Sequence, residues 1–250
     1  MLRIEQHGAV AILTLAHGKA SAMDLEFCRA LSEQFEKLRA SDARAVVITS
    51  TGSIFSAGVD LLRLTSEGPV YMHSFVGALT DFFKAAATFP KPLVAAINGH
   101  AIAGGCILAC CADRRVMARG PGRIGVPELQ VGVPFPRIAL ELVRLTVAPQ
   151  YLQEVVYSGQ TFTGEEALQR GLIDDLADPA DLAARAMEHA TRFAALPPGA
   201  FAITKQQLRQ PLVAAIREAR DGDAAVKDYW ASPAALDSIR AYVARTLKKK

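Results

Sequence analysis

The sequence predicts an α/β fold, and three features of the chain carry this prediction. Short apolar segments typical of buried strands alternate with amphipathic segments typical of helices along most of the chain. Two of these strands are followed by a turn that contains glycine and leads into a helix. The residues after about 195 show only helical patterns, so we expect an α/β body followed by a helical region.

Size and composition limit the class of protein. The chain of 250 residues can bury a good core in one domain, with a small appendage. Apolar residues make up 51% and charged residues 21%, which is typical of a globular chain. The net charge of +3, part of it from the lysines at 248–250, is too weak to indicate nucleic acid or an anionic membrane. No apolar leader follows Met1 and no uncharged run is long enough for a membrane span, so we expect a cytoplasmic protein.

The four cysteines are predicted to be core thiols. They lie in apolar helical contexts, without Cys-x-x-Cys spacing among the later three and without a nearby histidine cluster. We therefore expect neither a metal site nor a disulfide framework from Cys28, Cys106, Cys110 and Cys111.

The N-terminal part begins with a predicted β-hairpin. Residues 2–5 and 10–15 alternate in character and flank a glycine. Asp24 is suited to cap the next helix. In that helix apolar side chains recur at spacings of three and four, namely Leu25, Cys28, Leu31, Phe35 and Leu38. Residues 45–48 then predict a short buried strand.

A glycine-bearing junction follows this strand. Gly58 permits an unusual backbone angle, so that the Val59 N–H can point outward. Asp60 is expected to be a cap or turn brace and not a catalyst, because its carboxylate would compete for the same N–H groups. The helix expected at 70–88 is ended by the prolines at 90 and 92.

The central stretch repeats this arrangement. An apolar strand ending at Ile97 is followed by a hinge, the pair Gly104-Gly105, and an apolar helix up to Asp113. The first turn of a helix has N–H groups without partners, and glycine lacks the Cβ that would keep a ligand away. Gly104 and Gly105 could therefore present an N–H to an oxyanion or a phosphate. Glycines that only permit close helix packing are an equal alternative.

A loop rich in glycine and proline follows the strand expected at 114–117. Within the loop, Glu128 lies between Pro127 and Leu129 in apolar surroundings. Burial would raise the pKa of its carboxyl group and make it a better base. The local sequence alone favours a solvated loop glutamate, by roughly two to one.

The C-terminal part is predicted to be mostly helical. Thr163 and Glu166 form a capping box, Gly171 ends that helix, and residues 172–176 fit a short strand. Further helices are expected at 179–196, 199–219 and 232–247. This pattern divides the chain into a core at 1–195 and a helical region at 196–250. In the helical region, Trp230 and Tyr242 are expected to be packing residues, and the region should dock on its own body or on a neighbouring subunit.

Three motifs in order resemble those of the crotonase superfamily, the enoyl-CoA hydratase/isomerase group. They are SAGVDL at 56–61, NGHAIAGGC at 98–106 and PEL at 127–129. The resemblance covers nearly the whole chain. It implies a crotonase-like spiral of ββα units with a C-terminal helical trimerisation region. It also implies an acyl-CoA thioester substrate and a homotrimer or a dimer of trimers, with no nucleic-acid or membrane partner.

The same resemblance implies where the site lies. The N–H groups of Val59 and Gly104 would form an oxyanion hole for the thioester carbonyl. The coenzyme A part and the reacting acyl group would lie against Lys19, Ala20, Ala22, Ala57, Gly58, Asp60, Leu61 and Pro127. Phe135 is a candidate for lining the acyl pocket, with core packing as an equal alternative. Lys205 could meet a coenzyme A phosphate, although a surface lysine without such a role is more frequent.

One departure from the family pattern narrows the expected activity. Typical hydratases carry two glutamates that share the water, and this chain has Ile107 at the first position and Glu128 at the second. A single carboxylate suffices for a proton shuttle, so the pattern resembles the mitochondrial type of Δ3,Δ2-enoyl-CoA isomerase. We expect conversion of 3-enoyl-CoA to trans-2-enoyl-CoA with no metal and no cofactor beyond the coenzyme A of the substrate. The alternatives are an enoyl-CoA hydratase or another crotonase reaction with one acid/base, and a non-catalytic acyl-CoA-binding protein.

Overall fold

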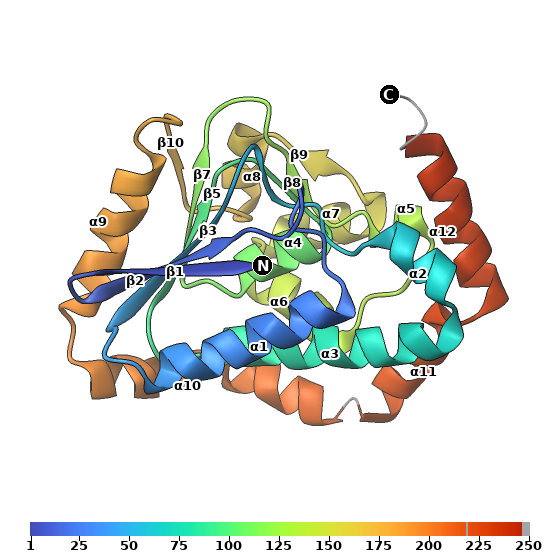
Figure 1. Cartoon of the computed structure of the whole chain (residues 1–250), viewed down its shortest axis with the longest axis horizontal. Helices are drawn as coiled ribbons and strands as arrows, with labels where there is room; N and C mark the ends of the chain where they lie inside the picture. Colours follow the sequence, from blue (N-terminus) through green and yellow to red (C-terminus); the bar gives the residue numbers. More distant parts are fainter. Residues whose placement is uncertain (219, 247–250) are drawn as a thin grey trace.

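Two sheets form the centre of the molecule (Figure 1). The computed structural model describes residues 1–218 and 220–246, so the lysines at 248–250 lie outside the described residues. The larger sheet has the order β1-β2-β3-β5-β7-β10 and the smaller sheet the order β4-β6-β8-β9. Pairs β1–β2 and β8–β9 are antiparallel, and every other neighbouring pair is parallel.

The strands are short, as is usual for buried parallel sheets. Those of the larger sheet are β1 (Leu2–His7), β2 (Val10–Leu15), β3 (Ala45–Ser50), β5 (Leu93–Ile97), β7 (Arg114–Ala118) and β10 (Asp175–Ala177). Those of the smaller sheet are β4 (Ile54–Ser56), β6 (His100–Ile102), β8 (Ile124–Gly125) and β9 (Thr161–Phe162).

The helices surround both sheets. The first group is α1 (Leu25–Ala40), α2 (Leu61–Glu67), α3 (Pro69–Ala87), α4 (Gly104–Cys110), α5 (Glu128–Val131) and α6 (Arg137–Thr146). A 3-10 turn, η1 (Pro149–Tyr151), precedes α7 (Leu152–Ser158) and α8 (Gly164–Arg170). The last group is α9 (Leu182–Ala194), α10 (Pro198–Glu218), α11 (Arg220–Trp230) and α12 (Pro233–Thr246).

The chain repeats one supersecondary unit three times. A strand of the larger sheet, a strand of the smaller sheet and then a helix follow one another as β3-β4-α2, β5-β6-α4 and β7-β8-α5. This confirms the predicted α/β spiral of ββα units. The predicted hairpin and the predicted strand at 45–48 are also present, as β1–β2 and β3.

Helices α1 and α3 cover one face of the larger sheet and lie side by side (Figure 1). The Asp24 carboxylate caps α1 by accepting from the Phe27 N–H at 2.7 Å, as predicted. Phe35 packs between Phe82 and Phe89, with ring centroids 6.3 and 5.5 Å away. Full burial of one such ring stabilises the fold by about 1.5–3 kcal/mol.

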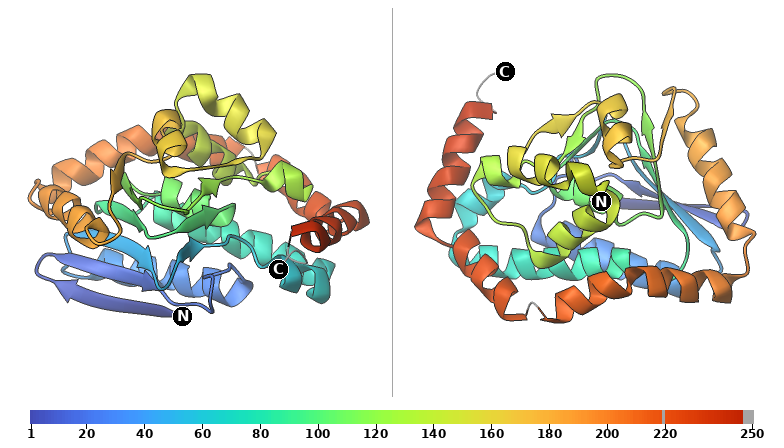
Figure 2. Two further views of the ribbon diagram at one scale, coloured as in Figure 1. Left: turned by 90° about the horizontal axis from the view of Figure 1, so that it is seen from above. Right: turned by 180° about the vertical axis from the view of Figure 1, so that it is seen from behind.

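Helix α9 covers the other face of the larger sheet. Its buried residues Leu182, Ala186 and Ala190 pack on Val47 and Val94 of the central strands. Helices α10, α11 and α12 then run around the body, as the rear view of Figure 2 shows. Helix α12 contacts α2 and α5, so the C-terminal region docks on its own chain. The division at residue 195 stays a prediction.

Some sequence predictions differ from the structure. The strand expected at 172–176 begins only at Asp175, because Leu172 belongs to the turn that ends α8 and its N–H donates to the Ala167 carbonyl at 3.0 Å. Helices α6, α7 and α11 are not among the elements predicted from the sequence. The helix expected at 232–247 ends at Thr246 within the described residues. Across 1–218 and 220–246, no helix combines the length and hydropathy that a membrane span requires.

Candidate active site

Three helix starts meet at one edge of the smaller sheet. Strands β4, β6 and β8 are parallel neighbours, so their carboxyl ends point the same way. After these ends the chain passes through Val59, shortly before α2, and through Gly104 and Glu128, the first residues of α4 and α5. Ligands commonly bind at the carboxyl ends of parallel strands in α/β folds. The topology therefore brings together the three predicted catalytic positions.

Gly58 holds the first two junctions in contact. Its φ is +79°, and a Cβ built there would lie 2.5 Å from the Ile102 carbonyl oxygen and 3.0 Å from the Gly104 nitrogen. Only glycine tolerates both this angle and this approach. The turn after β4 and the turn after β6 therefore touch at Gly58, and this contact explains why position 58 requires glycine.

The backbone around Val59 leaves its N–H outside the local pairing. Met23 and Val59 form a parallel bridge in which the Met23 N–H donates to the Gly58 carbonyl at 2.7 Å. The Asp60 N–H donates to the Met23 carbonyl at 2.9 Å. These two bonds involve Gly58 and Asp60, the residues on either side of Val59, so the bridge does not use the Val59 N–H.

Gly104 is the first residue of α4, where an N–H has no acceptor within the helix. The preceding residue, Ala103, has φ +50° and ψ −122°, which is strained for a residue with a side chain. Its N–H donates to the Gly125 carbonyl at 2.8 Å, so β8 holds this conformation in place. The strained Ala103 fixes the orientation of the Gly104 N–H, and nothing in the sequence signalled it.

Glu128 is the first residue of α5 and is 7% exposed. The local preference for a solvated loop glutamate is therefore wrong. Burial raises the pKa of the Glu128 carboxyl to about 8, and the neighbouring Cys110 thiol adds to the effect. Its Oε2 has no hydrogen-bond partner among the described residues. A buried carboxyl with a free oxygen and a pKa near neutrality is suited to accept and return a proton.

The pocket in front of Glu128 is small, with a cavity volume of about 70 Å³. Some lining residues were predicted from the sequence, and these come from the turn after β4 and from the start of α5. Others come from α11 and α12. The lining residues are Ala57, Val59, Leu61, Ile102, Ala103, Pro127, Glu128, Val131, Val133, Trp230 and Tyr242. This is mainly an apolar cavity with one buried carboxylate, a composition typical of small-molecule sites.

Trp230 and Tyr242 were predicted as packing residues of the helical region, and they also line this pocket. Burial raises the pKa of the Tyr242 hydroxyl, and the charge of Glu128 adds to the shift. Both residues lie more than 100 positions after Glu128 in the chain, so no local pattern could have placed them here.

The predicted coenzyme A loop lies against the turn after β4. The Ala57 N–H donates to the Ala20 carbonyl at 2.9 Å, while Lys19 is exposed and Ala22 is half-buried. Asp60 caps α2 by accepting from the Arg63 N–H at 3.0 Å, as predicted. This arrangement leaves an exposed surface at Ala57 beside the pocket.

Two apolar side chains lie in the main core and are not among the lining residues of the pocket. Phe135 is 9% exposed and packs in the core, so the structure supports its packing alternative. Ile107 is 1% exposed, on the turn of α4 that follows Gly104.

His100 accepts a hydrogen bond from the Arg123 N–H at 3.2 Å, in keeping with the packing role expected for it.

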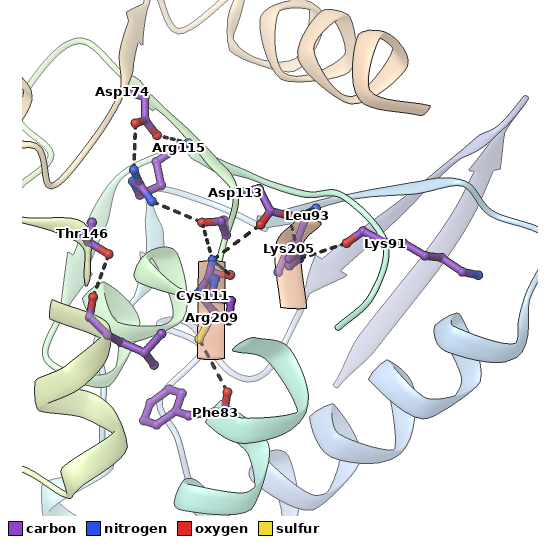
Figure 3. A network of polar contacts seen from close by, with 12 residues as sticks. Phe83, Lys91, Leu93, Cys111, Asp113, Arg115, Thr146, Asp174, Lys205 and Arg209 are labelled. Atoms are coloured by element: carbon purple, nitrogen blue, oxygen red, sulfur yellow. Dashed lines mark hydrogen bonds and ion pairs between the residues drawn. The ribbon is translucent and has the colours of Figure 1, made fainter. Parts of the chain in front are cut away.

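The expectation of a surface lysine at position 205 is wrong. Lys205 is 6% exposed, and its Nζ donates to Asp113 at 2.7 Å and to the Lys91 carbonyl at 3.0 Å (Figure 3). Burial lowers the pKa of Lys205, and the Asp113 carboxylate opposes that effect. Arg209 donates to the Cys111 carbonyl at 3.1 Å, at the C-terminal end of α4. Glycine contacts thus fix one end of α4, and this network fixes the other.

The four cysteines are free and buried, as predicted. Burial raises the pKa of the Cys28 and Cys111 thiols.

The family model described as enoyl-CoA hydratase/isomerase matches residues 5–247. The mouse protein named enoyl-CoA delta isomerase 1, mitochondrial, is 28% identical over 226 residues, which cover 89% of this chain and 78% of that protein. The Mycobacterium tuberculosis protein named probable enoyl-CoA hydratase EchA17 is 33% identical over 201 residues, covering 80% and 77%.

Among solved structures, human mitochondrial delta3-delta2-enoyl-CoA isomerase superposes with a TM-score of 0.95. The sequence identity is 27%, and the match covers 100% of this chain and 99% of that one.

Proposed function

The chain belongs to the enoyl-CoA hydratase/isomerase family, and from this premise we propose that it is a Δ3,Δ2-enoyl-CoA isomerase. It converts a 3-enoyl-CoA to a trans-2-enoyl-CoA. The observation that carries the proposal is that Glu128 is the one carboxylate, among the described residues, lining a pocket beside the Val59 and Gly104 junctions, and that it is buried. The second carboxylate of a hydratase is replaced by Ile107, which can neither position nor deprotonate water.

In the proposed mechanism the thioester carbonyl accepts hydrogen bonds from the N–H groups of Val59 and Gly104. The Glu128 carboxylate removes a proton from C2, and the electrons of that C–H bond pass into the dienolate and its oxygen. The same carboxyl group then returns the proton to C4, and the double bond moves between C2 and C3. Each donor to the developing oxyanion contributes about 10²–10³-fold to the rate.

Nothing is oxidised or reduced in this sequence, and one proton is taken and returned. The proposal therefore needs no metal or redox cofactor, and coenzyme A enters only as part of the substrate. The homotrimer or dimer of trimers and the cytoplasmic location remain proposals. Light scattering after gel filtration measures the first directly.

Two alternatives stay open. The 33% identity to a protein named as a probable hydratase favours water addition as the second candidate. A non-catalytic acyl-CoA-binding protein would show the pocket and the oxyanion donors without turnover. These three candidates predict different results in the same two assays.

The test is to measure isomerisation of 3-hexenoyl-CoA and hydration of crotonyl-CoA side by side with the same enzyme preparation. The proposal predicts a kcat/KM for isomerisation at least about 10²-fold above that for hydration, since general-base catalysis alone contributes 10²–10⁴-fold. Faster hydration would overturn the argument from Ile107. Binding of both esters without turnover would support the non-catalytic alternative.

A further inference from the structure

A second apolar cavity adjoins the pocket in front of Glu128, which we call the acyl pocket. We call the second cavity the outer groove, and its lining residues are Leu129, Gly132, Val133, Pro134, Ala225, Val226 and Tyr229. The two cavities share Val133, so only a thin wall separates them. The outer groove opens to the surface, because Leu129 is 45% exposed and Tyr229 is 49% exposed.

Trp230 lines the acyl pocket beside Val133, the residue that both cavities share. Its indole lines the acyl pocket and is 2% exposed, while the neighbouring Tyr229 lines the outer groove. The indole Nε1–H donates to the carbonyl of Pro134, another groove residue, at 2.8 Å. This hydrogen bond joins the two cavity linings and fixes the ring between them.

Helix α12 packs against the segment at 132–134, which lines the outer groove. Gly132 ends α5 with φ +92°, and a Cβ built there would lie 2.5 Å from the Ser238 Cβ. This close approach of α12 leaves the segment at 132–134 little room to move away from Trp230.

The exposure of the lining residues gives the pocket a direction. Ala57 at one end is exposed and adjoins the loop expected to hold coenzyme A. Among the other lining residues, Trp230 is 2% exposed and Val133 is 3% exposed, so both are buried. If a thioester is held at Val59 with its reacting carbons at Glu128, the rest of its acyl chain meets the buried apolar part of this lining, which includes Trp230.

We propose that Trp230 is the chain-length-determining residue of this enzyme and makes it selective for short and medium acyl chains. The inference rests on the proposed function, since it takes the pocket to hold an acyl-CoA thioester. A chain that reaches the indole stops there. With the indole removed, a longer chain passes beside Val133 into the outer groove and buries its terminal methylenes against Leu129 and Tyr229.

The test compares the wild type with Trp230→Ala, which opens the wall, and Trp230→Phe, which keeps an aromatic ring but removes the Nε1 donor. Tyr157→Ala is the matched control, since Tyr157 is a 69% exposed aromatic residue that lines neither cavity. Each protein is assayed with 3-hexenoyl-CoA and 3-dodecenoyl-CoA. Calorimetry gives the Kd of hexanoyl-CoA and dodecanoyl-CoA independently of turnover.

Each additional methylene that becomes buried contributes about fourfold in affinity or kcat/KM. We expect Trp230→Ala to raise the dodecenoyl-to-hexenoyl ratio of kcat/KM by at least about tenfold. Trp230→Phe should raise it by less, and Tyr157→Ala should leave it unchanged. A Trp230→Ala ratio equal to that of the wild type would overturn the proposal.

Two measurements on the wild type keep the proposal testable if Trp230→Ala does not fold. The wall predicts that dodecanoyl-CoA binds no more tightly than hexanoyl-CoA, whereas a gain of about 4 × 10³-fold for six further methylenes would refute it. Trp230 is the single tryptophan of the chain, so its fluorescence reports contact with the acyl end. Hexanoyl-CoA should change the emission and acetyl-CoA should not; equal changes would contradict the assignment.

Binding and turnover separate the two levels of the proposal. Chain-length selectivity in Kd without isomerisation of either enoyl ester would retain Trp230 as the wall and refute the proposed reaction. Isomerisation of both esters with equal kcat/KM in the wild type would retain the reaction and refute the wall.

Discussion

Replacement of Glu128 by glutamine should stabilise the protein at alkaline pH and have little effect at acid pH. The carboxyl group is buried, with its pKa raised from 4.5 to about 8. In the unfolded chain the group ionises freely above its ordinary pKa. The folded protein therefore binds one proton more than the unfolded chain between these two pKa values, and its stability falls as the pH rises through this window.

The structure sets the size of the effect. A rise of the pKa from 4.5 to about 8 corresponds to ~5 kcal/mol of stability at 1.36 kcal/mol per unit. Stability from this source is fully present below pH 4.5 and lost above about pH 8. Between pH 5 and pH 9 the wild type should lose about 4 kcal/mol relative to Glu128→Gln, which has no proton to lose.

The assay is urea unfolding of both proteins at pH 5 and pH 9, at one protein concentration because assembly also affects stability. The difference between the proteins cancels the other groups that titrate. Glu33→Gln is the matched control, since Glu33 is an exposed residue of α1. That variant should follow the wild type at both pH values.

A difference between Glu128→Gln and the wild type that does not change with pH would refute the reasoning. It would mean that the Glu128 carboxyl ionises in the folded protein as easily as in water.

Three further predictions follow from the structure. Gly58→Ala should destabilise the protein by about 1–3 kcal/mol in urea unfolding and should also lower kcat/KM. The reason is that the alanine Cβ would lie 2.5 Å from the Ile102 carbonyl oxygen, at a φ of +79°. Wild-type stability and kcat/KM would contradict the contact between the two turns. Lys205→Met should lower stability by about 3–5 kcal/mol, since Asp113 loses its closest buried partner. The Kd of Lys205→Met for an acyl-CoA should equal that of the wild type. Weaker binding by this variant would indicate that Lys205 contacts coenzyme A. A thiol reagent should modify the buried cysteines slowly in the native protein and all four after denaturation; rapid native labelling would contradict their burial.

Local patterns predicted much of the fold. The spacing of apolar residues identified α1, and the glycines after β4 and β6 identified two of the three junctions that form the site. Gly58 and Gly104 could be predicted because a backbone without Cβ is required where the two turns touch.

Distant contacts explain what the sequence did not reveal. Glu128 looks solvated in its own loop, and residues such as Trp230 and Tyr242 that help to enclose its pocket follow it by about 100 positions. Lys205 looks like a surface residue, and its partner Asp113 lies 92 positions away. The strain at Ala103 depends on a hydrogen bond to β8, which no local propensity encodes.

The central claim is that Glu128 alone transfers the proton. Its most direct test is the kcat of Glu128→Gln for isomerisation of 3-hexenoyl-CoA, measured together with the Kd for hexanoyl-CoA. We predict a loss of at least about 10²–10⁴-fold in kcat while the Kd stays within about threefold of the wild-type value. Isomerisation by Glu128→Gln at the wild-type rate would contradict the claim.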